Sequence, residues 1–304
     1  MNDGDDNVKV FYSKKMVAAN DGCFSPSASK PRLVVERWQQ NGAPVQIVES
    51  GRVSVEDLCL AHDRRHVERI LSCQRSNGFG NKSREVAAAL PYTTGAFYEA
   101  AEEALATGSI TCAPVSGFHH AGFSECGGYC SFNGLVVTAI KLHQEHGVMT
   151  VGILDLDAHY GDGTEDILGV LGIPPFDLAM VLNVDNYSPE RGEPQGSGAA
   201  YLEALERKLR EWTEGATPEI VLYQAGADLH EDDPLGGFLT TEQMATRDRI
   251  VFNWAARAGI PLAWCLAGGY QRDEDGGIEP VLRLHDQTMT ECVAALRLHS
   301  VGAA

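Results

Sequence analysis

Apolar residues in this chain fall into short runs that alternate with longer amphipathic stretches. The run 148–156 (VMTVGILDL) is apolar at nearly every position, as is typical of a parallel strand buried on both faces. Similar runs predict strands at 110–115, 148–156, 176–184, 219–224 and 261–266, with helices at 133–145, 200–212, 241–258 and 278–298. Strands that alternate with helices predict an α/β protein with a mainly parallel sheet.

The first hundred residues have a less regular pattern. Residues 31–40 begin with proline, which suits the first position of a helix, and Gly108 is placed to end a helix at 94–106. The remaining predictions are a short edge strand at 8–12, helical pieces at 55–60 and 63–72, and a polar loop at 78–83. No repeat, low-complexity tract or linker interrupts the chain, so we expect residues 1–304 to form one domain.

The formal net charge of the chain is −18 and its isoelectric point is near 4.9. Nucleic acid is therefore not an expected partner, because phosphate binding requires a basic face. An acidic surface favours cationic partners such as lysine-rich peptides or polyamines. The alternative is that the charge only keeps the protein dispersed, since net charge does not locate a patch.

The pattern also bears on the compartment. No apolar run reaches 18 residues, and residues 1–7 lack an apolar signal-type stretch, so we expect no membrane span. Eight cysteines are scattered without any C-x-x-C pair, which excludes a zinc ribbon or thioredoxin-type motif. Free thiols in a reducing cytoplasm are the expected state.

Clusters of polar residues directly follow four of the predicted strands. They are the segments 116–122, 155–163, 225–228 and 267–270. In an open parallel sheet, ligands bind outside the carboxyl ends of the strands. We therefore expect the four clusters to converge on one crevice.

Three residues of these clusters form a candidate metal site. Asp157, His159 and Asp228 offer one imidazole nitrogen and two carboxylates. Three protein ligands and an open position make up a catalytic zinc site, in which the metal polarises a carbonyl and lowers the pKa of a bound water. Ligands this hard also accept ferrous iron, cobalt or manganese, so zinc is a preference.

Five further residues are candidates for proton transfer and charge stabilisation. His119 and His120 suit general acid–base chemistry near neutral pH, and each needs an orienting carboxylate. Asp155 and Asp162 are available nearby for that purpose. Tyr270 can donate its hydroxyl to a developing oxyanion. Alone, a histidine pair is commonly incidental and Tyr270 a packing residue, but their occurrence together at strand ends favours a site.

These stretches resemble the zinc-dependent histone deacetylase family, with its bacterial relatives and the acetylpolyamine amidohydrolases. The resemblance extends over roughly residues 60 to 275, and the motifs occur in the family's order. They are GFHHA (117–121), GGYCSFN (127–133), DLDAHYGDGTED (155–166), QAGAD (224–228), DPLGG (233–237) and AGGY (267–270).

The resemblance implies the arginase–deacetylase fold, a mainly parallel sheet with helices on both faces, and hydrolysis of an acylated lysine peptide or an acylated small amine. It implies one Zn²⁺ per chain, held by Asp157, His159 and Asp228, and a structural monovalent cation, K⁺, near the same segment. It further implies that His119 pairs with Asp155 and His120 with Asp162, and that Tyr270 polarises the carbonyl. The oligomeric state stays open.

The resemblance also marks a substrate channel, with Gly128, Tyr129, Leu235 and Gly268 as its expected residues. Tyr129 stands where phenylalanine is common in the family, which keeps the ring and adds a hydroxyl. Leu235 stands where the polyamine-specific relative carries glutamate, and this favours a neutral channel mouth. A match for the acidic rim residue that grips the substrate backbone in many eukaryotic members is missing.

Two other functions compete with deacetylation. A dinuclear manganese ureohydrolase shares the fold class, and Asp157-Ala-His159 is faintly similar to its ligand motif, although its pair of aspartates two apart is absent. A non-catalytic acyl-lysine binding module is the third alternative. A module would not require metal ligands, both histidines and the tyrosine together.

Overall fold

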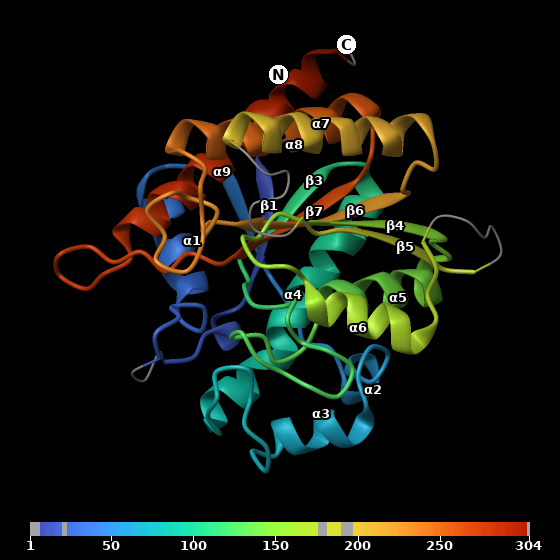
Figure 1. Cartoon of the computed structure of the whole chain (residues 1–304), viewed down its shortest axis with the longest axis vertical. Coiled ribbons are helices and arrows are strands. Elements are labelled where there is room, and N and C mark those ends of the chain that lie inside the picture. Colours follow the sequence, from blue (N-terminus) through green and yellow to red (C-terminus); the bar gives the residue numbers. More distant parts are fainter. Residues whose placement is uncertain (1–6, 20–22, 176–180, 190–196, 303–304) are drawn as a thin grey trace.

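The computed structural model describes residues 7–19, 23–175, 181–189 and 197–302. Its centre is a seven-stranded sheet with the strand order β2-β1-β3-β7-β6-β4-β5, in which all described pairs of neighbours are parallel (Figure 1). The strands are β1 (Val8–Tyr12), β2 (Val45–Glu49), β3 (Ile110–Ala113), β4 (Thr150–Asp155), β5 (Asn183–Tyr187), β6 (Ile220–Gly226) and β7 (Leu262–Ala267). The predicted α/β class with a parallel sheet is confirmed.

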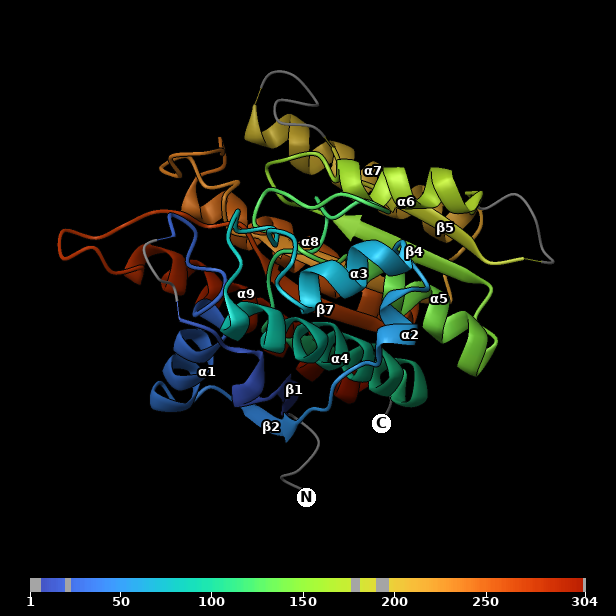
Figure 2. The same ribbon diagram turned by 90° about the horizontal axis from the view of Figure 1, so that it is seen from below.

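Helices cover both faces of the sheet (Figures 1 and 2). On one face lie α7 (Gly198–Glu214), α8 (Thr241–Ala258) and α9 (Glu279–Gly302), and on the other lie α4 (Arg84–Thr107), α5 (Gly134–His146) and α6 (Asp162–Leu171). The shorter elements are η1 (Lys14–Met16), α1 (Lys30–Gln40), which packs against α9, α2 (Val55–Leu58) and α3 (Arg64–Leu71). Within the described ranges, the helices lack an apolar stretch long enough to cross a bilayer.

The structure corrects the predictions for the amino-terminal strands. A strand forms at Val8–Tyr12 as predicted, but its predicted position at the edge of the sheet is wrong, because β1 pairs with both β2 and β3. The edge strand is β2, which the sequence pattern missed. None of its side chains is fully buried, so it lacks the apolar run that marks the inner strands.

Two other predicted boundaries also differ. Helix α4 begins at Arg84 and runs through Pro91, whereas the prediction started it at residue 94. Ser83 caps its first turn by accepting a hydrogen bond from the backbone N–H of Val86. The predicted strand at 176–184 falls partly on 176–180, which lie outside the described residues, and β5 begins at Asn183.

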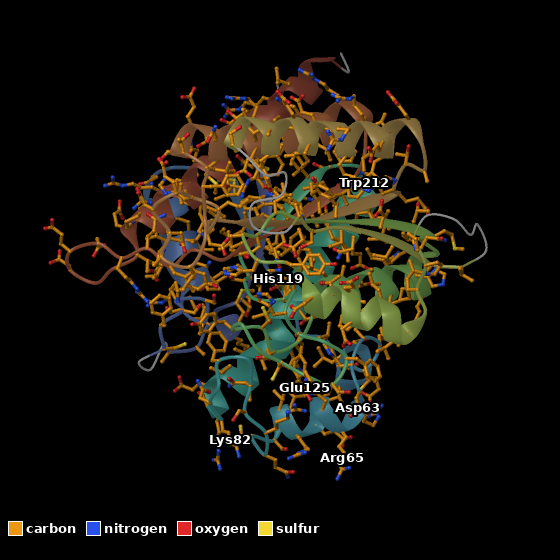
Figure 3. All side chains as sticks on the ribbon, in the orientation of Figure 1. Asp63, Arg65, Lys82, His119, Glu125 and Trp212 are labelled. Atoms are coloured by element: carbon orange, nitrogen blue, oxygen red, sulfur yellow. The ribbon has the colours of Figure 1, made fainter. Side chains whose placement is uncertain are left out.

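The order of the inner strands positions the site. Strands β3, β7, β6 and β4 are consecutive in the sheet and parallel, so their carboxyl ends lie at one edge. All described residues of β3, β6 and β7 are buried. The four polar clusters of the sequence follow these four strands, and they meet because the strand ends meet. His119, Asp157 and Asp228 are buried there. Figure 3 shows His119 near the middle of the view, away from Asp63, Arg65 and Lys82.

Candidate active site

A cluster of one imidazole and two carboxylates lies where β4 and β6 end. Nδ1 of His159 is 3.0 Å from Oδ1 of Asp157 and 3.0 Å from Oδ2 of Asp228. One donor atom from each residue lies within 4.8 Å of the others, which suits a single metal ion. Asp228 is oriented by the backbone N–H of Ala158, which donates to its Oδ1 at 3.1 Å. The predicted ligand set is therefore assembled in space.

The charges of this cluster fit a bound cation. Burial and the neighbouring charge of Asp157 raise the pKa of Asp228 to about 7. Burial opposes ionisation of Asp157 as well, but His119 and His159 hold its pKa below the usual range. Hydrogen bonds to Asp157 and Asp228 raise the pKa of His159 to about 10. Two buried carboxylates that compete for one imidazole proton are stabilised when a metal replaces that proton.

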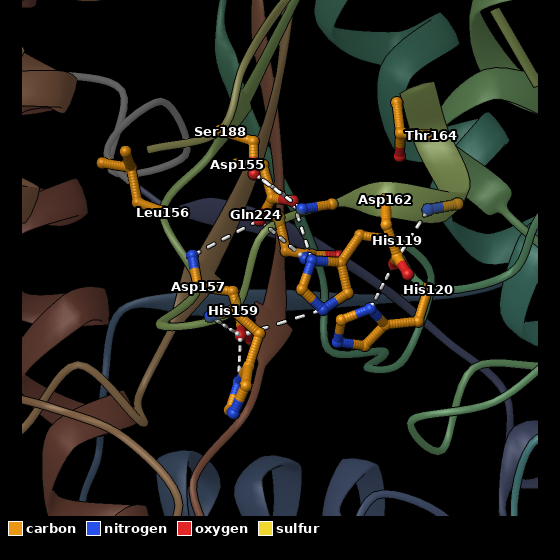
Figure 4. A network of polar contacts seen from close by, with 12 residues as sticks. His119, His120, Asp155, Leu156, Asp157, His159, Asp162, Thr164, Ser188 and Gln224 are labelled. Atoms are coloured by element: carbon orange, nitrogen blue, oxygen red, sulfur yellow. Dashed lines mark hydrogen bonds and ion pairs between the residues drawn. The ribbon is translucent and has the colours of Figure 1, made fainter. Parts of the chain in front are cut away.

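His119 lies in a buried network behind the cluster (Figure 4). Its Nδ1 donates to Oδ2 of Asp155 at 2.8 Å, and its Nε2 is 3.8 Å from Oδ1 of Asp157. Asp155 also accepts hydrogen bonds from Gln224 Nε2 at 2.8 Å and Ser188 Oγ at 3.3 Å. Burial lowers the pKa of His119, but the carboxylates of Asp155 and Asp157 outweigh it and raise this pKa to about 9.

His120 occupies a more open position beside His119. Its Nδ1 donates to Oδ1 of Asp162 at 2.6 Å, at the start of α6. Its side chain is 21% exposed, compared with 5% for His119. Burial and the adjacent charge of His119 lower the pKa of His120, against the opposing effect of Asp162. The structure thus forms both predicted histidine–aspartate pairs, and only the His119 pair is closed to solvent.

Tyr270 follows β7 and faces the same crevice. Its ring lies between Phe24 and Tyr129, with centroids 5.8 Å from each. Its backbone N–H donates to Oδ2 of Asp233 at 2.7 Å. Burial and the charges of Asp157 and its neighbours raise the pKa of the phenol well above its ordinary value. The hydroxyl therefore keeps its proton at neutral pH and remains a hydrogen-bond donor.

A small internal cavity of about 10 Å³ joins these groups. It is lined by residues from all four strand ends and from the segment before α1, among them Ser27, Ser116, His119, Asp157, Gln224 and Tyr270. Two glycines allow the backbone to lie close to side chains of the site. A Cβ on Gly128 would lie 2.4 Å from the His120 ring, and a Cβ on Gly268 would lie 2.2 Å from Cγ of Asp228.

The predicted channel residues divide into two groups. Gly128 and Gly268 line the cavity, and both have positive φ. Tyr129 also has a positive φ, of 64°, which is strained for a residue with a side chain, and its ring contacts those of Phe79 and Tyr270. Leu235 is not among the described residues that line this cavity. It lies on the segment after β6, where its backbone N–H donates to Oδ1 of Asp233 at 3.0 Å.

Several neighbours of the site escaped the sequence analysis. Lys30 is fully buried, and its amine donates to the carbonyl of Gly268. Burial lowers the pKa of Lys30 to about 8, against the opposing charges of Asp228 and Asp157. Asp233 accepts a hydrogen bond from the backbone N–H of Tyr270, and the hydroxyl of Ser188 donates one to Asp155. The sequence around Lys30 and Ser188 does not indicate a role at the site, whereas Asp233 is the first residue of the DPLGG motif.

Several known proteins are similar to this chain in sequence. Histone deacetylase 2 of Arabidopsis thaliana is 31% identical over 173 residues, covering 51% of this chain and 43% of that protein. The acetylpolyamine amidohydrolase of Mycoplana ramosa is 32% identical over 177 residues, covering 52% and 50%. A probable deacetylase of Methanothermobacter thermautotrophicus is 26% identical over 295 residues, covering 88% and 87%.

These alignments differ in extent. The chain spans about half the length of the plant and Mycoplana relatives, and nearly the whole of the archaeal one. The histone deacetylase domain family matches residues 26–188 and 182–277, which together make up most of the chain. That match contains the Asp157–His159–Asp228 cluster, both histidine–aspartate pairs and Tyr270. The chain therefore belongs to the histone deacetylase family.

Proposed function

We propose that this chain is a zinc-dependent amide hydrolase that removes an acetyl or other short acyl group from an acylated lysine or a related acylated amine. The supporting observation is that the Asp157–His159–Asp228 cluster lies beside two histidine–aspartate pairs and Tyr270 around one crevice. Binding alone would not require that combination. We further propose that residues 1–304 form one catalytic domain.

The ligand set favours Zn²⁺, held by Asp157, His159 and Asp228. When bound, this metal would polarise the acyl carbonyl and acidify a water molecule. The donors are one nitrogen and two oxygens without sulfur, so ferrous iron, cobalt or manganese would also fit. His119, His120 and Tyr270 lie around this cluster, and each has a separate role in proton transfer or hydrogen bonding.

His120 is the proposed general base. Its Nδ1 hydrogen bond to Asp162 leaves Nε2 as the acceptor, and its lowered pKa keeps the ring neutral near pH 7. The proton of the attacking water passes to Nε2, and the amide carbon becomes tetrahedral. Tyr270 donates to the oxyanion. His119, whose pKa is raised by Asp155 and Asp157 in the metal-free protein, stabilises negative charge in its protonated form or delivers a proton to the leaving amine as the C–N bond breaks.

A structural monovalent cation, K⁺, is the second proposed ion. The support is a buried carboxylate, Asp155, in the DxDxH segment, with the hydroxyl of Ser188 3.3 Å from its Oδ2. Carboxylate, hydroxyl and backbone oxygens suit a hard cation. Among the described residues the cysteines form no disulfide bond, which supports the proposal of a reducing compartment such as the cytoplasm.

Turnover of defined substrates tests the proposal. The zinc-loaded protein is expected to release acetate from an acetyl-lysine fluorogenic peptide and to be inhibited by a hydroxamate. Acyl-lysine peptides and acetylated polyamines, assayed side by side, would identify the preferred amine. If acylated peptide binds tightly in a titration and remains intact after long incubation, the binding module is the better description. Absence of turnover on all these substrates would contradict the hydrolase.

The ureohydrolase alternative predicts two metals per chain. In the described residues, the strand ends carry one group of three potential ligands, Asp157, His159 and Asp228. A two-metal site requires further bridging carboxylates. Elemental analysis is expected to find one tightly bound transition metal per chain, and two would favour the manganese enzyme.

A further inference from the structure

A buried arginine bridges the backbones that carry the two carboxylate ligands. Arg247 lies on α8, and its side chain is 1% exposed. Its Nη1 donates to the carbonyl of Leu156 at 3.2 Å and to the carbonyl of Gly226 at 2.5 Å. Leu156 directly precedes Asp157, and Gly226 is two residues before Asp228. One guanidinium nitrogen therefore connects the two strand ends immediately behind the metal cluster.

The bridge lies where the hydrogen-bond ladder between β4 and β6 ends. Leu156 N–H donates to the carbonyl of Gln224 at 3.0 Å, and Gly226 N–H donates to the carbonyl of Leu156 at 3.2 Å. Beyond this point the segments that follow β4 and β6 turn into the loops that carry Asp157 and Asp228. They are tightly apposed, because a Cβ on Gly226 would lie 2.5 Å from Cα of Asp157. A small change in strand spacing here would move both carboxylates.

Asp248 balances the charge of the bridge. Nε and Nη2 of Arg247 lie 2.9 and 2.8 Å from Oδ1 of Asp248. Asp248 is also buried, and it accepts hydrogen bonds from the hydroxyl of Tyr223 and, at 2.6 Å, from that of Thr288. Apolar residues of similar volume often give a core the same stability as a buried ion pair. Stability therefore does not by itself account for this arginine, whereas its contacts to two ligand-bearing strands do.

We infer that Arg247 is a positioning residue. It fixes the spacing of the Asp157 and Asp228 carboxylates and so sets the affinity of the Asp157–His159–Asp228 site for the metal ion. This inference rests on the proposed metal site, but it does not depend on which amide is hydrolysed. Arg247 is not itself a ligand, and it acts only through the backbone. Its guanidinium geometry matters, because a lysine ammonium cannot keep two contacts to Asp248 while it also bridges two carbonyls.

The test is the Zn²⁺ dissociation constant of the metal-free protein, measured by competition with a chelator and without substrate. Arg247→Met and the charge-neutral pair Arg247→Met with Asp248→Asn should weaken Zn²⁺ binding about 10–100-fold, as is typical when groups that orient metal ligands are lost. Arg247→Lys should fall between Arg247→Met and the unmodified protein. Asp228→Ala provides the reference for a destroyed site.

Thr288→Val is the matched control. It removes a buried hydrogen bond to Asp248 while leaving the arginine–carbonyl contacts in place. It should lower the melting temperature and leave Zn²⁺ affinity unchanged. If affinity instead follows melting temperature through all variants, Arg247 has only a structural role. The same conclusion follows if the folded double variant binds Zn²⁺ as tightly as the unmodified protein.

The result is separable from the proposed function. An inactive protein whose Zn²⁺ affinity depends on Arg247 would overturn amide hydrolysis and support the inference. An active deacetylase whose double variant keeps full Zn²⁺ affinity would do the reverse. If Arg247→Met alone does not fold, the double variant still decides, since it leaves no unpaired buried charge.

Discussion

The rings of His119 and His120 lie 4.0 Å apart, yet their environments shift the two pKa values in opposite directions. His119 faces Asp155 and Asp157 in a buried network, and its pKa rises to about 9. His120 lies nearer the solvent beside a positive neighbour, and its pKa falls below its ordinary 6.5. Neighbouring groups whose pKa values are pushed apart can serve as base and acid at the same pH.

This pair predicts a bell-shaped pH profile for kcat/KM. Activity requires neutral His120, so it should fall as pH drops through a value below 6.5. It also requires protonated His119, so it should fall again at alkaline pH; the pKa of His119 is about 9 in the metal-free protein, and a cation bound beside Asp157 would place this limb at a lower pH. Asp162→Asn removes a group that raises the pKa of His120 and should move the acid limb to lower pH. An unmoved acid limb in that variant would assign it to another group.

Tyr270→Phe tests the proposed oxyanion donor. The hydroxyl strengthens its bond in the transition state, so its loss should lower kcat about 10²–10³-fold while changing KM much less. The ring keeps its packing against Phe24 and Tyr129, so melting temperature and zinc content should not change. Tyr129→Phe is the matched control and should retain kcat. Near-full activity of Tyr270→Phe would reduce Tyr270 to a packed aromatic.

Removal of a metal ligand should abolish binding of the ion. Asp228→Ala leaves Asp157 and His159 with one carboxylate and one imidazole, which is too few donors for a stable zinc site. Elemental analysis should find the metal lost in this variant and in His159→Ala. Tyr270→Phe, prepared in parallel, should retain it. Full metal content in Asp228→Ala would place the ion elsewhere.

His62 predicts a loss of stability in acid that is independent of the metal. Its Nδ1 donates to the carbonyl of Gly122 at 2.8 Å, and its Nε2 accepts from the N–H of Asn133 at 2.8 Å. Burial lowers its pKa to about 4. In the unfolded chain the pKa of this histidine is about 6.5. Between this pH and pH 4, the unfolded chain therefore binds a proton at His62 while the folded chain keeps the ring neutral. The free energy of unfolding should therefore lose about 3 kcal/mol as pH falls from 6.5 to 4.

Urea denaturation of metal-free protein between pH 7 and pH 4 measures this loss. His62→Gln should be less stable at pH 7 and should show a shallower decline with acid than the unmodified protein. His143→Gln, at a partly exposed position in the last turn of α5, is the control and should keep the full decline. Equal slopes for all three proteins would show that His62 does not govern acid stability.

Leu235→Glu tests the proposed neutral channel mouth. The residue is partly exposed and lies on the same segment as Asp233, which holds Tyr270. A carboxylate there should attract the second amine of an acetylated polyamine, with a gain of about 0.5–1 kcal/mol for an exposed pair, or two- to fivefold in kcat/KM. Leu235→Gln separates charge from polarity. An unchanged ratio of polyamine to peptide turnover would place Leu235 away from the substrate.

The local pattern was enough to predict the fold class and the polar clusters that meet at the strand ends. Buried parallel strands are apolar along their whole length, so the inner strands stand out, and polar residues at their ends need partners. The segment DLDAHYGD after β4 is the strongest case. Because parallel strands end at one edge, the polar clusters had to meet there.

The tertiary structure alone decided what lies around those residues. Lys30 under Gly268, Ser188 beside Asp155 and Arg247 behind the ligand-bearing strands are brought in from elements far away in sequence. Helix α4 runs through Pro91, and β2 pairs at the sheet edge without an apolar run. A sequence pattern reports which face of an element is apolar. It does not report which distant side chain fills the space opposite, because long-range packing and charge pairing select that partner.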